Sequence, residues 1–460
     1  MTTPRDTEEI RLVGAGLAGS LLAILLARRG HRVTIHERRP DPRKIRASSG
    51  RSINLALANR GIHALERAGV MDRVRPALIP MAGRMLHDEN GGLKLVPYGN
   101  KPHEVIYSVS RGGLNAALID AAEATGRVAI RFGETCVGVD FGRRRLRLHA
   151  GGDATIRESA YEVLLGTDGS ASAVRAAIVD AAKGDLVEEP LGHGYKELSI
   201  PAASGGGFRM EKNALHIWPR GEYMLIALPN ADGSFTATLF LPNRGEESFE
   251  ALRSPEDVRR LFESRFPDAI PLLPDLVDDF FGNPTGHLET IRCRPWHFDD
   301  QALILGDAAH AIVPFHGQGM NAAYEDCDEL DRLLDRPDRP WKELFAEFED
   351  IRRPNTDAIA DMALENYVEM RSTVREPLFQ LKKELSFRLE ERHPRRFVPR
   401  YSMVMFHRIP YAEAKRRGEI QDAILDDLTR KARSVGNVDF GLADRLIAER
   451  LSEDATLATS

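Results

Sequence analysis

A short segment in the last third of the 460-residue chain combines glycines with polar and aromatic side chains. In PFHGQGMN, Gly317 and Gly319 flank Gln318, and an aromatic pair comes just before them. Glycine lets a backbone pass close to a bound molecule, because it carries no Cβ. The helical pattern that follows has no acid in its first turn, so its positive end is free to stabilise negative charge. The segment therefore predicts a loop between a bound ligand and a set of rings.

A second glycine-rich segment opens the chain. A short apolar strand, IRLV, runs into GAGLAG at 14–19, and an apolar helical pattern follows and stops at Gly30. The next strand, HRVTIHE, ends in Glu37, which lies 23 residues after Gly14. This order of strand, glycines, helix, strand and acid is typical of dinucleotide binding: the helix N-terminus faces the pyrophosphate and the acid meets a ribose hydroxyl.

Two later strands also end beside a glycine and an aspartate. LLGTDGSASAVR, at 164–175, contains Asp168, and ALILGDAAHAIVP, at 302–314, contains Asp307. Glycine lets the backbone approach a ligand at each strand end. Three such strand ends, spread over about 300 residues of the chain, favour a long, extended cofactor over a compact nicotinamide pocket.

GAGLAG, then TDG with Arg175 downstream, then GDAAH resemble the three fingerprints of the single-component FAD-dependent aromatic hydroxylases, up to about residue 330. The resemblance implies an α/β fold with a Rossmann-like FAD-binding domain. It also implies that Asp307 contacts the ribityl chain, that the DG motif lies near the pyrophosphate, and that Arg111 contacts FAD. From motif and resemblance together we expect cofactor contacts from Gly14, Gly16, Leu17, Ala18, Gly19, Glu37, Arg38, Arg111, Asp168, Asp307, Gly317, Gln318, Gly319, Met320 and Asn321.

Other segments are similar to the branch of this family that acts on L-kynurenine, in its soluble bacterial form. They are GRSINLALANRG (50–61), GHGYKELSIP (192–201), GDAAHAIVPFHGQGMNAAYED (306–326), NYVEMR (366–371) and YSMVMFHRI (401–409). This resemblance implies hydroxylation to 3-hydroxy-L-kynurenine in tryptophan degradation. NADPH and O2 are the implied co-substrates, and a C4a-hydroperoxide of the flavin is the implied oxygen donor. No residue is assigned as a general acid or base, because the cofactor carries the chemistry.

The substrate residues rest on the same resemblance. Arg84 and Tyr98 can bind a carboxylate, through a charge-assisted contact and a phenolic donor. On residue type alone, Arg84 is more often a surface arginine and Tyr98 a packing tyrosine. Asn366 and Glu369 share one face of a predicted helix. The full predicted substrate set is Arg84, Tyr98, Phe315, His316, Asn366, Glu369 and Tyr401.

The segments between the flavin motifs predict a second layer. YMLIALPNADGSFTATLFLP, at 223–242, is typical of a hairpin, and we expect it to belong to an antiparallel sheet that covers the substrate pocket. A charged helical region follows, broken by Pro354, Pro377 and Pro394. The predicted division is an FAD-binding domain at 8–75, 103–180 and 285–335, a substrate domain at 76–102 and 181–284, and a C-terminal helical region at 336–460 that closes the pocket.

Composition narrows the class of protein. The net charge of −6 and the lack of a long basic run argue against nucleic acid as a partner. Three scattered cysteines, Cys136, Cys293 and Cys327, predict neither a disulfide framework nor a zinc site, and a reducing cytoplasm fits them. The longest apolar run, LLAILLA, is too short for a bilayer, and the histidines lack metal-ligand spacing, so neither a membrane anchor nor a metal is expected.

Two other functions stay open on the sequence. One is a related hydroxylase of a phenol or benzoate, and the other is an FAD redox protein that does not hydroxylate. The predicted assembly is a homodimer.

Overall fold

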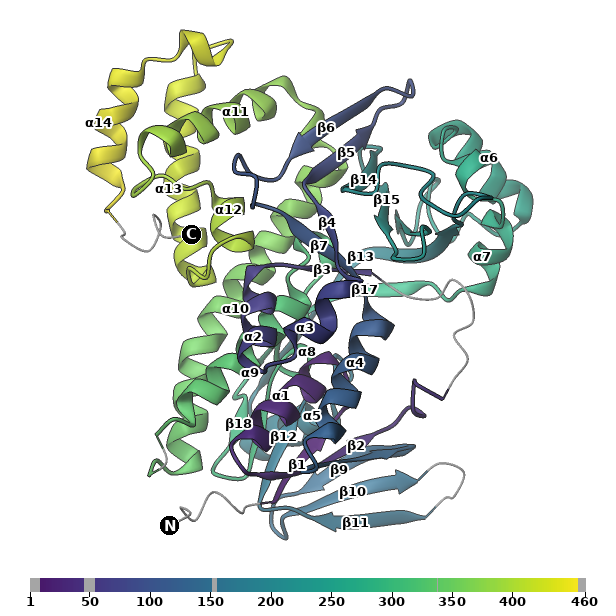
Figure 1. Cartoon of the computed structure of the whole chain (residues 1–460), viewed down its shortest axis with the longest axis vertical. Coiled ribbons are helices and arrows are strands. Elements are labelled where there is room, and N and C mark those ends of the chain that lie inside the picture. Colours follow the sequence, from purple (N-terminus) through teal and green to yellow (C-terminus); the bar gives the residue numbers. More distant parts are fainter. Residues whose placement is uncertain (1–8, 45–53, 151–154, 337, 454–460) are drawn as a thin grey trace.

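The computed structural model describes residues 9–44, 54–150, 155–336 and 338–453. Positions 45–53, which include the start of GRSINLALANRG, lie outside the described residues, as do both chain ends. A parallel sheet lies at one end of the molecule and a larger mixed sheet at the other (Figure 1). The C-terminal helices run along the side of both (Figure 1).

The parallel sheet has the order β18-β19-β12-β1-β2-β8, with only the β18–β19 pair antiparallel. Its strands are β1 (Glu9–Val13), β2 (Arg32–Glu37), β8 (Val128–Phe132), β12 (Val163–Gly166), β18 (His297–Phe298) and β19 (Ala302–Ile304). Helices pack against the sheet, so its central strands are short apolar runs, as in VLLG and ALI. The associated helices are α1 (Leu17–Arg28), α4 (Arg111–Ala124), α5 (Ala173–Ala182), α8 (Asp307–His310) and α9 (Gly319–Leu333).

The mixed sheet has seven strands in the order β17-β13-β16-β15-β14-β5-β6. Its strands are β5 (Gly83–His87), β6 (Leu93–Pro97), β13 (Asp185–Ile200), β14 (Ala214–Pro219), β15 (Met224–Pro229), β16 (Phe235–Pro242) and β17 (Gly286–Arg294). The predicted hairpin is confirmed, because β15 pairs with β16 antiparallel around the PNADG turn. The strand pairs of this sheet are antiparallel except for one, since β5 pairs with β14 in parallel after a long connection.

Successive side chains of the hairpin strands point to opposite faces of the mixed sheet. Leu225 and Leu239 pack into a cluster with α6 (Pro255–Arg265) and α7 (Leu276–Gly282). Met224 and Ile226 point to the opposite face, which lines a cavity. Because successive strand residues point to opposite sides, a single hairpin both builds a core and forms the wall of a pocket.

Two smaller sheets complete the described strands. One has the order β3-β7-β4, from β3 (Asn54–Leu57), β4 (Ile79–Met81) and β7 (Ile106–Ser110). The other is a meander of β9 (Glu134–Asp140), β10 (Arg145–Ala150) and β11 (Ile156–Ala160). Short helices α2 (Asn59–Arg67) and α3 (Met71–Val74) follow β3. The helix α2 packs on α9, which places the β3 segment beside the loop at 314–319.

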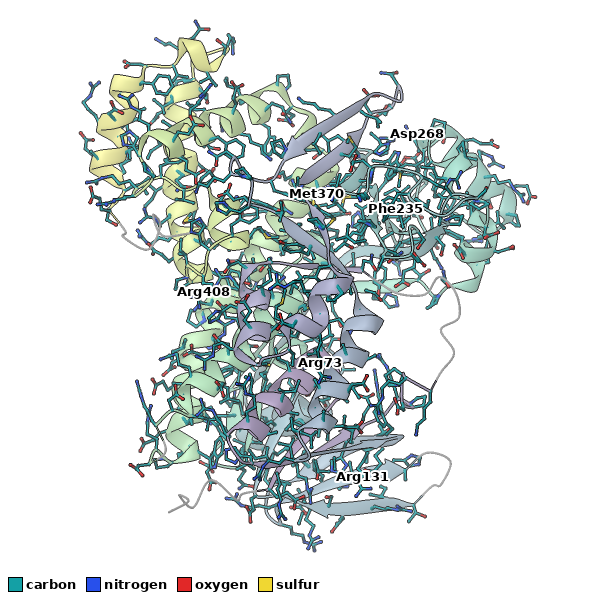
Figure 2. The ribbon with its side chains drawn as sticks, viewed as in Figure 1. Arg73, Arg131, Phe235, Asp268, Met370 and Arg408 are labelled. Carbon is teal, nitrogen blue, oxygen red and sulfur yellow. The ribbon has the colours of Figure 1, made fainter. Side chains whose placement is uncertain are left out.

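The C-terminal region is helical, as the residue pattern predicts. It contains α10 (Trp341–Arg371), α11 (Pro377–Arg392), α12 (Arg400–Met405), α13 (Tyr411–Thr429) and α14 (Phe440–Arg450). In Figure 2, Met370 at the end of α10 lies between these helices and the sheet that carries Phe235. None of the described helices is long and apolar enough to cross a membrane.

The prediction that Pro354 breaks the helical region was wrong. The helix α10 runs for 31 residues and contains Pro354, whereas Pro377 begins α11 and Pro394 follows its end. An interior proline costs a helix about 3 kcal/mol through a lost hydrogen bond and a clash. The buried face of α10, with Phe348, Ile359 and Met362, outweighs this local cost.

Pro354→Ala should therefore stabilise the protein, by about 1–3 kcal/mol in the free energy of unfolding, since Pro354 is exposed and lies inside a helix. Pro377→Ala is the matched control: it is an exposed proline at the first helical position, where proline is favourable, so no gain is expected. Urea unfolding of both variants measures the difference. An equal or lower stability of Pro354→Ala would show that α10 tolerates the proline without cost.

Candidate functional site

One cavity of about 700 Å³ joins the carboxyl ends of the parallel strands to the mixed sheet. This volume lies within the range of small-molecule sites. Most of the predicted site residues border it: Gly14, Gly16, Leu17, Ala18, Glu37, Arg38, Arg84, Tyr98, Arg111, Asp168, Asp307, Phe315, His316, Gly317, Gly319, Met320 and Tyr401. Gly19, Gln318, Asn321, Asn366 and Glu369 do not border it. The cavity thus brings together segments that are more than 300 residues apart.

The GAGLAG turn has the geometry of a phosphate site. Gly14 has φ +100°, and a Cβ there would come within 2.4 Å of the Thr167 carbonyl oxygen. At Gly16 a Cβ would meet nothing within 4 Å, so this position faces open space. The helix α1 starts at the next residue with no acid in its first turn. Its N-terminus is therefore open to an anion. Gly19 instead serves helix–strand packing, because a Cβ there would lie 2.0 Å from the Gly14 carbonyl oxygen.

Glu37 closes the other side of this turn. Its Oε2 accepts a hydrogen bond from the Ala15 backbone N at 2.8 Å, and its Oε1 accepts one from Arg39 N at 2.8 Å. The turn is also held from α4, where Asn115 Nδ2 donates to the Ala15 carbonyl oxygen at 3.2 Å. Glu37 is thus fixed at the end of β2 beside the turn, where it could accept a ribose hydroxyl.

Asp168 has a structural task that the sequence pattern does not reveal. Its carboxylate accepts from Ser172 Oγ at 2.6 Å and from Ala173 N at 2.8 Å, so it holds the first turn of α5. Burial raises the pKa of Asp168, and these hydrogen bonds oppose the rise. Arg175 connects this turn to the GDAAH turn by donating to the Ser170 and Ala308 carbonyl oxygens.

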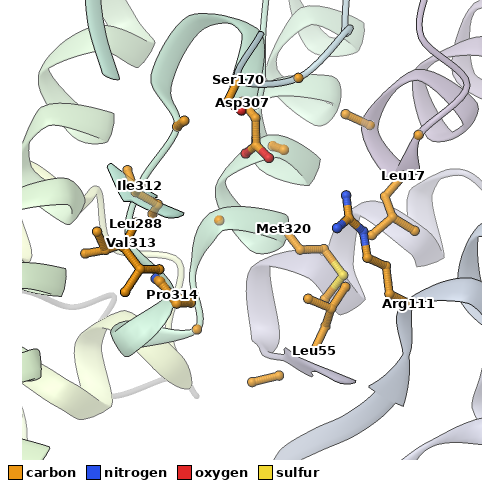
Figure 3. Close-up of a pocket in the computed structure, with 18 of the residues that line it drawn as sticks. Leu17, Leu55, Arg111, Ser170, Leu288, Asp307, Ile312, Val313, Pro314 and Met320 are labelled. Atoms are coloured by element: carbon orange, nitrogen blue, oxygen red, sulfur yellow. The ribbon is translucent and has the colours of Figure 1, made fainter. Parts of the chain in front are cut away.

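Asp307 and Arg111 approach the cavity from different elements. Figure 3 shows the Asp307 carboxylate and the Arg111 guanidinium projecting into the same opening. Asp307 follows Gly306, whose φ of +61° turns the chain at the end of β19. The Gly306 N donates to Asp326 Oδ2 at 2.9 Å, which fixes that turn from α9. The position of Asp307 is therefore set by a residue that the sequence pattern did not single out.

The loop 314–319 borders the cavity with its glycines and its aromatic pair. Gly317 has φ +67°, and a Cβ there would come within 3.1 Å of Ala56. The helix α9 starts at Gly319 with no acid in its first turn, as the sequence predicts. Gln318 and Asn321, which we expect to contact the cofactor, do not border the cavity. Asn321 Oδ1 accepts from Ala58 N, and its Nδ2 donates to the Ala56 and Gly317 carbonyl oxygens, all at 2.9 Å.

Arg84 lies buried at the end of the cavity far from the GAGLAG turn. Only 3% of it is exposed, and its guanidinium lies 5.7 Å from the Tyr98 ring and 5.2 Å from the Tyr401 ring. Arg84 Nη1 donates to Glu369 Oε1 at 2.6 Å, and Nη2 donates to Asn366 Oδ1 at 3.3 Å. Its buried Nε has no hydrogen-bond partner among the described residues. Burial lowers the pKa of Arg84, but the Glu369 carboxylate together with Tyr401 and Tyr98 outweighs this and raises the pKa above its usual value.

Asn366 and Glu369 therefore act on Arg84 and not on the cavity wall itself. Asn366 Nδ2 also donates to the Phe315 carbonyl oxygen at 2.6 Å, which connects the arginine to the loop 314–319. Phe315 stacks on Tyr367 with ring centroids 3.9 Å apart. His316 stacks on Tyr401 at 5.3 Å. Residue type alone suggested that Arg84 lies at the surface, but in the structure its guanidinium is buried among these groups.

Sequence reasoning missed most of the apolar wall between the two ends. The missed cavity residues include Leu215, Met224, Ile226, Leu228, Thr238, Phe240, Met370 and Met405. Strand alternation could have identified the β15 and β16 members, because every second residue of a two-faced strand points the same way. Tyr195 and Glu197, in GHGYKEL, also border the cavity. Burial raises the pKa of Glu197, and Arg111 opposes the rise.

The donor set fits FAD. It offers an open helix N-terminus for a pyrophosphate, a strand-end glutamate for a ribose, a strand-end aspartate for a ribityl chain, and the N-terminus of α9 for a flavin ring.

Comparison with known proteins agrees with this geometry. The family described as "FAD binding domain" matches residues 7–363. The chain is 49% identical over 448 residues to kynurenine 3-monooxygenase of Myxococcus xanthus (strain DK1622), a match that covers 97% of this chain and 96% of the relative. It is 48% identical over 449 residues to kynurenine 3-monooxygenase of Xanthomonas euvesicatoria pv. vesicatoria (strain 85-10), with 98% of each covered.

Solved structures share the fold at lower identity. 2-Methyl-3-hydroxypyridine-5-carboxylic acid oxygenase has a TM-score of 0.65 at 22% identity, over 81% of this chain and 94% of that one. PqsL of P. aeruginosa, in complex with 2-aminobenzoylacetate, has a TM-score of 0.63 at 21% identity, over 80% and 97% of the two chains. These likenesses establish the architecture, and the near-full-length relatives establish the family. The chain belongs to the kynurenine 3-monooxygenase family of FAD-binding-domain proteins.

Proposed function

We propose that the chain hydroxylates L-kynurenine to 3-hydroxy-L-kynurenine, with FAD as cofactor and NADPH and O2 as co-substrates. Kynurenine, NADPH, O2 and one proton give 3-hydroxykynurenine, NADP⁺ and water. The redox chemistry, uptake of hydride from NADPH and transfer of one oxygen atom of O2 to the aromatic ring, would be supplied by FAD when bound. The tasks that fall to the chain are to hold the amino acid, aim its ring and exclude water.

The enclosed guanidinium of Arg84 carries this proposal. An unpaired, buried Nε and two aromatic hydroxyl-bearing neighbours suit a carboxylate, which accepts charge-assisted hydrogen bonds. Burial raises the pKa of Tyr98 to about 12, and Arg84 opposes the rise. Tyr98 therefore stays protonated at neutral pH and can donate to that carboxylate.

Glu369 holds the charge of Arg84 from outside the cavity wall. It pairs with Arg84 at 2.6 Å, its side chain is 27% exposed, and it does not border the cavity. Glu369 therefore fixes the guanidinium, and a ligand in the cavity would meet that cation through its carboxylate. A phenol needs no buried cation. The enclosed Arg84 thus favours a substrate with a carboxylate, such as an amino acid, over a phenol.

The apolar wall would then hold the aromatic ring beside the loop 314–319. Met224, Ile226 and Phe240 form one side, and Phe315 lies across from them with its ring 5.0 Å from Phe240. A dry wall matters because, where water reaches the flavin, NADPH, O2 and a proton would give NADP⁺ and H2O2 in place of the hydroxylated product and water. Gly317 and Gly319, in the same loop, also border the cavity.

A cytoplasmic location and a homodimeric assembly stay predictions. All three cysteines are free, which is in keeping with a reducing compartment.

Arg84→Gln should lower kcat/KM for kynurenine at least about 100-fold, mainly through KM, because a buried charged partner of the carboxylate is lost. The wild-type enzyme should lose a similar factor with the amine analogue that lacks the carboxylate, and Arg84→Gln should treat the two substrates nearly alike. Arg388→Gln, at an exposed ion pair on α11, is the control and should behave as wild type. If Arg84→Gln still discriminates strongly between the two substrates, Arg84 does not bind the carboxylate.

His316 should make the protein less stable in mild acid. Burial lowers the pKa of His316 to about 4 in the folded protein, whereas the unfolded chain has the ordinary value of about 6.5. As the pH falls, the unfolded chain is therefore protonated first. Stability contributed by the neutral ring is present above pH 6.5 and is lost as pH falls towards 4. His316→Asn should shrink the loss between pH 7 and pH 5 by about 1–2 kcal/mol.

Urea unfolding at both pH values measures this effect, with His103→Asn, at an exposed histidine, as the control. An unchanged pH dependence in His316→Asn would mean that His316 accepts its proton in the folded state.

A further inference from the structure

The side chain of Gln318 points away from the cavity that its two glycine neighbours border. It is fully buried, and both ends of its amide are bonded to the C-terminal region. Tyr411 Oη donates to Gln318 Oε1 at 2.7 Å, and Gln318 Nε2 donates to Met405 Sδ at 3.0 Å. These partners lie 93 and 87 residues further along the chain. The amide is thus a cross-link between the loop 314–319 and the segment that joins α12 to α13.

Tyr411 is itself fixed on its other side. Its ring is fully buried, and the Arg60 guanidinium lies 3.9 Å from the ring centroid. Arg60 in turn donates to Glu325 on α9 and to the Ile409 carbonyl oxygen. The hydroxyl of Tyr411 is therefore presented to Gln318 by a ring that is held in one place, which makes the bond directional.

The backbone of Gln318 sits where the loop becomes a helix. Its carbonyl oxygen accepts from Ala322 N at 2.8 Å, the first intrahelical bond of α9. Gly317 precedes it with φ +67°. Because both ends of the Gln318 amide are hydrogen-bonded to the C-terminal region, the backbone at Gly317 and Gly319 presents one fixed surface to the cavity. Met405 also borders the cavity, so the same segment contacts both the loop and the pocket.

We infer that Gln318 is a positioning residue, through which α12 and α13 hold the loop 314–319 in the conformation that receives the flavin ring. The inference rests on the proposed function, because the flavin gives this loop its task. The C-terminal region then does more than close the substrate pocket: it sets the cofactor side as well. Loosening the bond admits water beside the flavin, so that NADPH, O2 and a proton yield NADP⁺ and H2O2 in place of the hydroxylated product and water.

Packing alone does not account for this arrangement. A leucine or methionine could fill the same buried space without requiring partners, whereas a buried amide needs a donor and an acceptor. Both are supplied by one segment, Met405 at the end of α12 and Tyr411 at the start of α13. Hydrogen bonds of Asn321 join the loop to β3. Among the described residues, the Gln318 side chain bonds only to the C-terminal region.

Tyr411→Phe tests the bond, because it removes only the hydroxyl and keeps the ring on Arg60. Tyr324→Phe is the matched control: Tyr324 is equally buried on α9, and its hydroxyl has no hydrogen-bond partner among the described residues. FAD-free protein is titrated with FAD, and the H2O2 formed per NADPH is measured with kynurenine. We expect the FAD Kd of Tyr411→Phe to rise about 3- to 10-fold and its H2O2 yield to increase, while Tyr324→Phe matches wild type.

Gln318→Met and the double variant complete a cycle. If the two residues act as one unit, the double variant is no worse than either single one. Equal behaviour of Tyr411→Phe and Tyr324→Phe, or simple additivity in the cycle, overturns the inference. If wild type itself binds no FAD or does not hydroxylate kynurenine, the proposed function fails. If wild type turns over normally and the variants match it in FAD affinity and H2O2 yield, only the present inference fails.

Amide hydrogen exchange of the wild-type protein tests the inference without any substitution. Peptides that cover residues 314–320 should already be protected in the FAD-free protein, because the C-terminal region holds the loop. Protection that arises only after FAD is added would show that the cofactor orders the loop, and would overturn the inference.

Discussion

The carboxylate of Asp326 is the interaction on which the arrangement of the site depends. It is fully buried and accepts hydrogen bonds from Gly306 N, His310 Nε2 and Arg352 Nε. Burial alone would raise the pKa of Asp326, but His310 and Arg352 outweigh it and hold the pKa below its ordinary value. A buried charge left without its partner costs about 3–5 kcal/mol, so these bonds form together or fail together.

Because its partners lie on different elements, this one carboxylate sets several distances at once. The bond to Gly306 fixes the turn that carries Asp307, and the bond to Arg352 joins α9 to α10. At its far end α10 carries Asn366 and Glu369, which orient Arg84. The cofactor end and the substrate end of the cavity are thus held by the same pair of helices. The loop 314–319 lies between the two ends, tied to β3 by Asn321 and to α13 by Gln318.

The sequence predicted the parts whose chemistry is local. Three features could be predicted because they depend on residue types within a few positions: GAGLAG, the strand-end residues Glu37 and Asp307, and the hairpin at 223–242. The partners of buried polar side chains could not be predicted, since they lie far along the chain. Gln318 and Asn321 look like ligand contacts in PFHGQGMN, yet their partners are Tyr411 and β3. Pro354 looked like a helix break because the pattern does not show how much apolar surface α10 buries.

The central claim is that the enclosed guanidinium of Arg84, oriented by Glu369, holds the carboxylate of an amino acid so that its ring meets the flavin at one carbon. The most direct measurement is product analysis of the FAD-loaded protein with L-kynurenine, NADPH and O2. The account predicts that kynurenine stimulates NADPH oxidation and that the product is 3-hydroxy-L-kynurenine, nearly one per NADPH consumed. Hydroxylation at another ring carbon, or NADPH oxidation that is indifferent to kynurenine, would contradict it.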